Sequence, residues 1–191
     1  GVSQLVSVDL EDAVKILDKH ASVTSDDSRR VELLVQKARI LAEQVGSPER
    51  AIKTYEQVLA LQAGHAGALE APAALKESSG DAHAALSAIE SLAAKATTAE
   101  GKAEQWIRAA RLLDARGDKD GAIERYKMAL EANPKDAAAS AALRQAYGVR
   151  GDYASVLSLI EKELTTAEGD LAKARLFGEQ AKVYLTRLKE D

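Results

Sequence analysis

Apolar residues recur along most of the chain at intervals of three and four, which is the spacing of an amphipathic α-helix. The pattern is clearest where Trp106, Ala110 and Leu113 are followed, after a break, by Ala122 and Tyr126. It predicts helices at residues 10–21, 28–44, 48–61, 66–79, 81–95, 101–116, 119–132, 136–149, 152–166 and 170–188. Ala, Leu, Glu, Lys and Arg dominate the composition and favour helix throughout, so we expect an all-α protein.

Glycine followed by a polar residue marks four of the breaks between these helices. Gly-Asp pairs begin at Gly80, Gly117 and Gly151, and Gly46 is followed by Ser47. The spacing of the four glycines is close to a period of about 34 residues, which is typical of a helix-turn-helix repeat. We expect each glycine to end a helix in the left-handed conformation, and the residue after it to cap the next helix.

The segment from residue 103 to residue 136 resembles one tetratricopeptide (TPR) repeat at nearly every diagnostic position. These positions hold Trp106, Ala109, Ala110, Leu113, Gly117, Ala122, Tyr126, Ala129, Leu130 and Pro134. Small side chains at Ala110 and Ala122 suit the point where the two helices of a hairpin cross, and Pro134 suits the end of the second helix. The resemblance implies a right-handed superhelical solenoid of antiparallel helix hairpins, with about ten helices in the chain.

The remaining copies resemble the TPR pattern less closely. We expect a single repeat domain over residues 1–191, with repeats near 31–64, 66–99, 103–136 and 137–170 and partial hairpins at 1–22 and 171–191. The departures are one extra residue before Gly46, a proline at Pro72 and a large side chain at Arg144. Pro72 predicts either a kinked helix or a helix that starts late enough to hold the proline in its first turn. In both cases we expect easy local opening of residues 64–79.

A pentapeptide, Thr-Thr-Ala-Glu-Gly, occurs at residues 97–101 and again at 165–169. The second copy follows the first by two repeat periods. Common repeat ancestry with the same loop chemistry therefore explains the recurrence better than a binding motif does.

Two types of hairpin alternate along the chain. The first helices of one type hold Leu34, Trp106 and Phe177 at equivalent positions, and the second helices that precede them contain Leu17, Ile89 and Ile160 at matching intervals. Phe177, Ala181 and Tyr184 also repeat the spacing of Leu34, Ala38 and Leu41. The last helix therefore resembles the first half of a hairpin, and residues 10–21 resemble the second half of another. We expect a segment of a longer bacterial array, with uncapped ends that can associate end to end.

Charge and composition exclude several classes of function. The chain has a formal net charge of -4 and a pI near 5.5, which argues against nucleic acid as a partner. It has no cysteine, so thiol catalysis, disulfides and thiolate metal sites are absent, and the cytoplasm is favoured over the periplasm while both stay open. No apolar run is long enough to cross a membrane, so direct membrane insertion is not expected.

The sequence also lacks a pattern of catalytic or cofactor-binding residues. His20, His65 and His83 have no second histidine or carboxylate at helical ligand spacing, so we interpret them as surface residues. Asp26 and Asp27 suggest paired carboxylates for acid–base chemistry, but they precede a predicted helix, and Asp27 or Ser28 is better explained as its N-cap. No phosphate loop, nucleophile elbow or dinucleotide fingerprint is present. We therefore expect no enzymatic activity and no cofactor.

The resemblance to TPR proteins implies a scaffold that presents a concave groove to a peptide or partner subunit. In chaperone-binding TPR domains, Lys and Asn at the fifth and ninth positions of first helices hold a terminal carboxylate. Here those positions hold Val35 and Arg39, Glu70 and Ala74, Ile107 and Arg111, and Ala141 and Gln145, so this clamp is missing. A structural spacer without a ligand, or a regulatory domain appended to an enzyme, remains an alternative.

The ninth positions nevertheless offer a candidate binding surface. Arg39, Arg111 and Lys182 recur there in every second hairpin and predict a row of cations, with Val35 and Ile107 as neighbouring apolar contacts. Such a row suits an acidic protein or peptide with spaced apolar anchors. We include Glu32 and Asp114 in the candidate groove because they lie near these cations. The alternative is that the cations are ordinary solvated charges paired with Glu32, Glu43 or Asp114.

Overall fold

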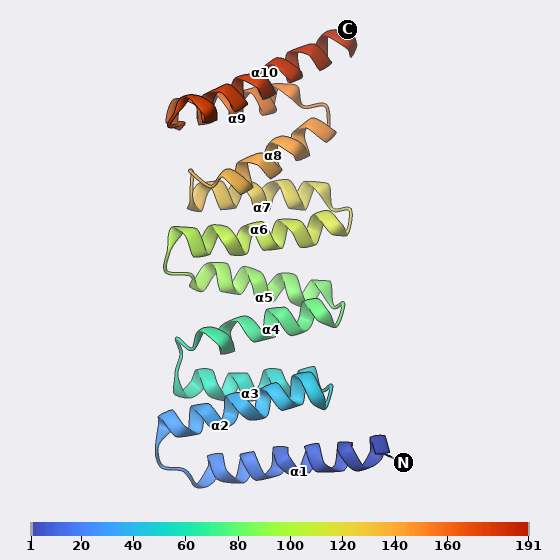
Figure 1. Cartoon of the computed structure of the whole chain (residues 1–191), viewed down its shortest axis with the longest axis vertical. Helices are drawn as coiled ribbons and strands as arrows, with labels where there is room; N and C mark the ends of the chain where they lie inside the picture. The colour runs from blue at the N-terminus through green and yellow to red at the C-terminus, as the bar shows by residue number, and fades with distance from the viewer. Residues whose placement is uncertain (1, 191) are drawn as a thin grey trace. The chain divides into compact units, whose positions relative to one another are not determined.

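The computed structural model describes residues 2–190, with side chains from Asp9 to Arg187, and contains ten α-helices and one π-helix in that part of the chain. The helices are α1 (Val2–Val23), α2 (Asp27–Arg39), η1 (Ile40–Gln44), α3 (Pro48–Leu61), α4 (Ala66–Ser78), α5 (Ala82–Lys95), α6 (Ala99–Ala115), α7 (Lys119–Ala132), α8 (Ala137–Val149), α9 (Tyr153–Thr166) and α10 (Asp170–Glu190) (Figure 1). The prediction of an all-α fold of about ten helices is confirmed, and no strand occurs between residues 2 and 190.

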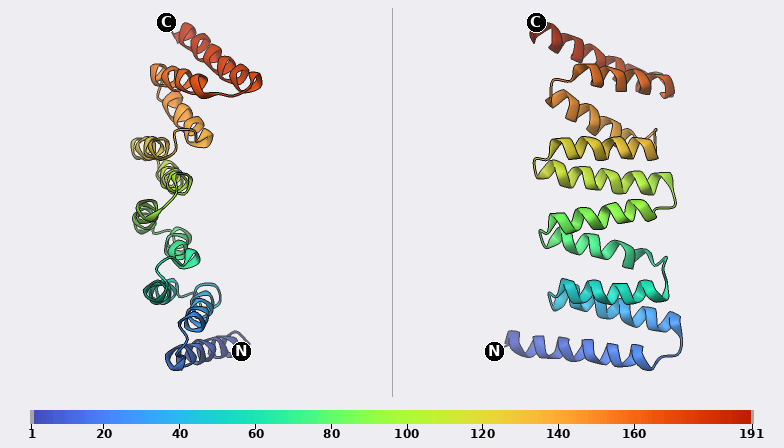
Figure 2. Two further views of the ribbon diagram at one scale, coloured as in Figure 1. Left: turned by 90° about the vertical axis from the view of Figure 1, so that its left-hand side faces the viewer. Right: turned by 180° about the vertical axis from the view of Figure 1, so that it is seen from behind.

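The chain forms two compact units, residues 1–88 and residues 89–191, with the boundary inside α5. In each unit, consecutive helices run antiparallel and pack as neighbours (Figure 1). In the second unit, α6 and α8 lie on one side and α7 on the other, as the left-hand view of Figure 2 shows. This is the alternation of first and second helices that the hairpin pattern predicts.

The predicted glycine turns are present. Gly46, Gly80, Gly117 and Gly151 have φ angles of 70°, 79°, 82° and 71°, in the left-handed region that favours glycine. After three of them an aspartate caps the next helix; the backbone N–H of Gly121, for example, donates to the carboxylate of Asp118 at 2.9 Å. After Gly46, Ser47 occupies the predicted N-cap position of α3, but its side chain makes no cap hydrogen bond, so this part of the prediction is wrong.

Two helix starts differ from the expected positions. The first helix begins at Val2 instead of residue 10, because no glycine or proline interrupts residues 2–10 and an existing helix extends at little cost. The cap of α2 is Asp26, one residue before the expected pair Asp27 and Ser28, and its carboxylate accepts the N–H of Ser28 at 2.9 Å.

The extra residue in the first full repeat lies inside a helix and not in a loop. The last turn of the α2 segment is the π-helix η1, in which the N–H of Val45 donates to the carbonyl of Ile40 at 2.9 Å. A π-turn contains one more residue than an α-turn. Gly46 therefore keeps its place at the end of the helix even though the segment is one residue longer than its counterpart.

Small side chains allow the two helices of the third hairpin to approach each other closely. Ala110 on α6 and Ala122 and Ala129 on α7 are at most 1% exposed. Leu113 and Tyr126 are buried beside them and fill the space between neighbouring helices. In the first unit, Ala38, Val58 and Ala68 are completely buried in the same way.

Pro72 lies within α4, well past the first turn of a helix that begins at Ala66. A late helix start that would place the proline in the first turn is therefore ruled out. The proline has no N–H to donate to the carbonyl of Ala68, four residues earlier, and Ala68 is fully buried. One backbone hydrogen bond of α4 is lost at this point.

Arg144 occupies a position where TPR repeats usually have a small residue, and it is held by charge. Its side chain is only 10% exposed; its guanidinium pairs with Glu163 on α9, and its Nε donates to Glu179 on α10 at 3.0 Å. The hydroxyl of Ser140 also donates to Glu163. The three helices are thus linked by one polar network that has no unsatisfied buried side-chain group among the described residues.

We expect the backbone amides of residues 64–79 to exchange with solvent faster than those of residues 103–132, because α4 lacks one hydrogen bond. Pro72→Ala should slow exchange in α4 and stabilise it by no more than about 3 kcal/mol, since alanine restores the missing N–H. Hydrogen exchange measured by mass spectrometry checks both statements. The matched control is Pro134→Ala, which changes a loop proline and should leave exchange in α4 unaltered. Slower exchange at residues 64–79 than at 103–132 in the wild type would contradict the expectation.

Arg144→Ala is expected to lower the free energy of unfolding by about 2–3 kcal/mol, because it leaves the half-buried carboxylate of Glu163 without its cationic partner. The double variant Arg144→Ala with Glu163→Ala should lose less than the sum of the single changes. Urea denaturation of the four proteins measures this coupling. As a control, Lys127→Ala removes an exposed pair with Glu124 and should cost less than about 1 kcal/mol. Additive effects at Arg144 and Glu163 would rule out the coupling.

Candidate functional site

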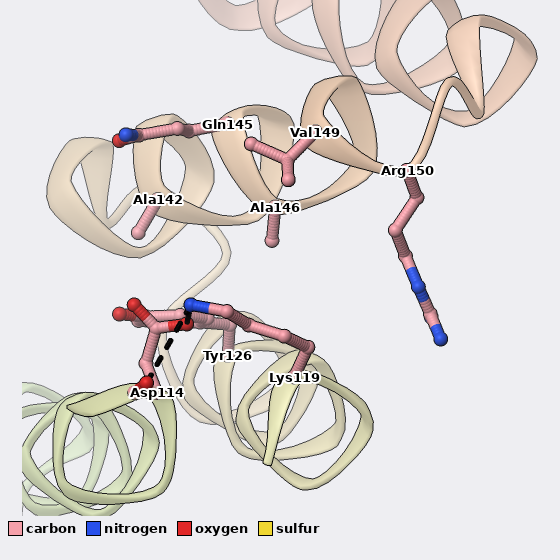
Figure 3. Close-up of a pocket in the computed structure, with 8 residues that line it drawn as sticks. All are labelled: Asp114, Lys119, Tyr126, Ala142, Gln145, Ala146, Val149 and Arg150. Atoms are coloured by element: carbon pink, nitrogen blue, oxygen red, sulfur yellow. Dashed lines mark hydrogen bonds and ion pairs between the residues drawn. The ribbon is translucent and has the colours of Figure 1, made fainter. Parts of the chain in front are cut away.

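The second unit contains a small cavity between α6, α7 and α8, which we call the α6–α8 groove. Its volume is about 130 Å³, and it is lined by Asp114, Lys119, Tyr126, Ala142, Gln145, Ala146, Val149 and Arg150 (Figure 3). Ala142 and Ala146 are one helical turn apart on α8, and their small side chains leave space above Tyr126 of α7. Val149 at the edge is 76% exposed, so the groove combines hydrogen-bonding groups with an accessible apolar side chain.

A larger groove lies on the other side of α8, between α8, α9 and α10. This α8–α10 groove has a volume of about 360 Å³ and is lined by Ala141, Arg144, Gln145, Gly148, Tyr153, Val156, Ile160, Glu179, Lys182, Val183 and Thr186. Gln145 lines both grooves. A ligand that crosses α8 at Gln145 could therefore contact the two grooves together.

The charges in the two grooves are not balanced equally. The carboxylate of Asp114 is paired with Lys119 at 2.7 Å, and Glu179 is paired with Arg144. Lys182 is exposed and takes part in no ion pair between residues 9 and 187. The groove carboxylates are thus neutralised, while Lys182 remains available to an anionic group.

Tyr126 lies at the floor of the α6–α8 groove and is surrounded by charged residues. Burial raises the pKa of its hydroxyl, the charge of Asp114 adds to this effect, and Arg111 and Lys119 oppose it. Burial likewise raises the pKa of Tyr55 in the first unit, where Glu43 adds to the effect and Arg39 opposes it. Both hydroxyls are therefore neutral at pH 7 and can donate as well as accept a hydrogen bond.

Three of the predicted site residues lie around the grooves of the second unit. Asp114 lines the α6–α8 groove and Lys182 lines the α8–α10 groove. Arg111 is exposed on α6, close enough to the Tyr126 hydroxyl for its charge to affect that group, and has no ion-pair partner among the described side chains. Ile107 is only 7% exposed, so the expectation that it offers an apolar contact to a ligand is wrong, because neighbouring helices already cover it.

The remaining predicted residues belong to the first unit. Arg39 is exposed and lies close enough to the hydroxyl of Tyr55 for its charge to oppose the rise in the pKa of that group. Val35 is half-buried and packs against the core of that unit. Glu32 is exposed and pairs with Arg29 at 2.6 Å, so it is not the partner of Arg39. The alternative that the ninth-position cations pair with nearby carboxylates is also wrong at Asp114, whose partner is Lys119 and not Arg111.

Tyr126, Gln145 and Val149 line the grooves but were not predicted as site residues. Gln145 holds the ninth position of its repeat, the position that holds Arg39 and Arg111 in other repeats. Its side chain carries no charge, so the predicted row of cations does not include it. Tyr126 matched a packing position of the repeat, and only the structure shows that it also lines a cavity.

The histidines have structural or surface positions. His20 and His83 are exposed, as predicted, whereas Nδ1 of His65 accepts the N–H of Ala68 at 3.1 Å and caps α4. No group of three His, Cys, Asp or Glu side chains suited to holding a metal ion occurs in the described part of the chain. None of the helices between residues 2 and 190 has the length and apolar character needed to cross a membrane.

The chain is similar in structure to several solved proteins. No family model and no curated protein sequence matches it. MamA is 19% identical, with a TM-score of 0.52 over 94% of this chain and 95% of that chain. A tetratricopeptide repeat protein from Parabacteroides merdae is 20% identical, with a TM-score of 0.52 over 95% of this chain and 68% of that one. TPR-like repeats of a kinesin light chain from Podosopora anserina are 20% identical, with a TM-score of 0.50 over 87% and 90% of the two chains. These similarities confirm the predicted TPR-like fold.

Proposed function

We propose that the chain is a protein-binding scaffold and not an enzyme, and that the α6–α8 and α8–α10 grooves bind one extended segment of a partner protein. The observation that carries the proposal is the position of Gln145, which lines both grooves. The amide side chain can donate to and accept from the backbone of an extended ligand at the point where it crosses α8.

The charges favour an acidic ligand. The lining carboxylates Asp114 and Glu179 already have cationic partners, whereas Lys182 in the α8–α10 groove and Arg111 beside the α6–α8 groove have none among the described residues. An acidic side chain of the ligand gains an ion pair at Arg111 or Lys182 without displacing an existing one. A basic ligand would have to break the pair of Asp114 with Lys119.

The ligand also needs an apolar anchor. Val149 is highly exposed at the edge of the α6–α8 groove, and Ala142 and Ala146 leave room beside it. A medium-sized apolar side chain can cover Val149 and enter this space, which removes apolar surface from water. We therefore propose an acidic segment with spaced apolar residues as the ligand class.

Labelled peptides about twelve residues long test the proposal, because a peptide of this length can span both sides of α8. One peptide alternates Glu with Leu, a second alternates Lys with Leu, and a third alternates Glu with Ser. We expect binding of the Glu–Leu peptide alone, with affinity falling as salt increases. Arg111→Glu and Lys182→Glu should each weaken it by roughly fivefold, which corresponds to about 1 kcal/mol. Fluorescence anisotropy across a salt series measures these effects.

Lys162→Glu is the matched control, because it reverses an exposed cation on α9 that lines neither groove. It should leave the affinity unchanged. If none of the three peptides binds while circular dichroism shows intact helices, the result favours the alternative that the chain is a structural spacer without a ligand. Equal binding of the acidic and basic peptides would contradict the proposed ligand class.

A further inference from the structure

Two consecutive helices of the first unit recur in the second unit at a constant interval, so their side chains can be compared position by position. Helix α7 begins at Lys119, 71 residues after α3 begins at Pro48. The starts of α4 and α8 are separated by the same interval, and the helices of each pair have equal length. Ala68 of α4 and Ala139 of α8, which this interval relates, are both completely buried. Residues related by the interval therefore hold equivalent places, each within its own unit.

The floor of the α6–α8 groove has a counterpart in the first unit. Tyr126 of α7 corresponds to Tyr55 of α3, and both side chains are buried. The charges of one arginine and one carboxylate from the preceding helical segment act on each hydroxyl. The two units thus share the floor, and the difference between them lies in the helix that follows it.

One side chain of that following helix differs in size between the units. Ala146 of α8 corresponds to Leu75 of α4. Leu75 packs against the core cluster that contains Tyr55 and against the cluster that contains Leu41. In the second unit the short side chain of Ala146 points from α8 towards Tyr126, and the groove lies between them (Figure 3). The α6–α8 groove is therefore found where the first unit has the side chain of a leucine.

The volume of the groove agrees with this difference. Replacing one buried leucine by alanine in a protein core can leave a cavity of about 150 Å³. The α6–α8 groove has a volume of about 130 Å³. Ala142 does not account for the space, because its counterpart in the first unit is also an alanine, Ala71. The groove thus has room for one leucine side chain, whereas the much larger indole ring of tryptophan does not fit.

The charges around the groove suit a leucine that has acidic neighbours. Lys119 and Arg150 line the groove, whereas their counterparts in the first unit are uncharged. Lys119 pairs with Asp114 and Arg150 pairs with Asp120. Arg111 beside the groove has no ion-pair partner among the described side chains, so the cations exceed the carboxylates by one. Charge complementarity therefore favours an apolar residue that is flanked by carboxylates.

We propose that the α6–α8 groove is a pocket for one leucine side chain of the bound segment, which packs on Tyr126 below Ala142 and Ala146. The leucine of the partner takes the place that the chain's own Leu75 takes in the first unit. Entry of the leucine also covers the exposed side chain of Val149 and removes apolar surface from water. This inference rests on the proposed function and specifies it, because it names the residue of the ligand that enters the groove.

Ala146→Leu fills the pocket with a side chain of the protein itself and tests its size and its use together. The variant should unfold at a urea concentration at least as high as the wild type, because the added side chain enters existing space. It should weaken binding of the Glu–Leu peptide by about tenfold or more, because the leucine of the peptide is excluded. The matched control is Ala154→Leu, the same change at an exposed position of α9 that lines neither groove, which should leave the affinity unaltered.

Peptides that differ at one residue identify the side chain that enters the pocket. Each is twelve residues long and alternates Glu with Ser, with one central Ser replaced by Leu, Ala or Trp. Fluorescence anisotropy with the wild type should show the Leu peptide binding about tenfold more tightly than the other two. The Ala146→Leu variant should bind the three peptides alike, because the preference is lost when the pocket is filled. Equal binding of the three peptides to the wild type would contradict the assignment of leucine.

The possible results separate this inference from the proposed function. If the Glu–Leu peptide binds the wild type and Ala146→Leu equally well, the partner segment does not use the pocket, and this inference alone is overturned. A lower urea midpoint in Ala146→Leu than in the wild type would show that the groove does not hold a leucine and would overturn it as well. If the wild type binds no peptide, the proposed function fails and the inference fails with it.

Discussion

Each helix of this protein buries its apolar face against the helices that flank it in the sequence, and the rest of the structure depends on this nearest-neighbour packing. The hairpin of α6 and α7 shows the requirement most clearly, because Ala110 and Ala122 must both be small for the helices to approach. Stability in such a fold is the sum of contacts between adjacent elements. Apolar residues that no described helix covers, such as Phe177 on α10, are exposed for the same reason.

The same dependence on neighbours explains how irregular repeats are tolerated. A surplus residue before Gly46 is contained in the π-helix η1, so the glycine still ends the helix and the next hairpin is not displaced. The large side chain of Arg144 is accommodated because Glu163 and Glu179 on the next two helices neutralise it. Each irregularity is compensated within one or two helices, because no long-range packing has to adjust.

The grooves of the second unit result from this arrangement. They combine small residues of α8 with hydrogen-bonding groups and a free cation, as at Gln145 and Lys182. Such a surface suits an extended peptide that needs partners for its backbone.

The local chemistry of the sequence determined the helices and their ends. Gly117 and its counterparts end helices because only glycine adopts the left-handed conformation without strain, a property that needs no information about neighbours. Tertiary structure decided the features that depend on what lies nearby. The pentapeptide at 97–101 caps and begins α6, whereas the identical one at 165–169 ends α9 and forms a loop, so the expectation of shared loop chemistry is wrong. Ile107 is buried and Gln145 lines two grooves for the same reason, since the burial of a side chain is set by the helices that pack around it.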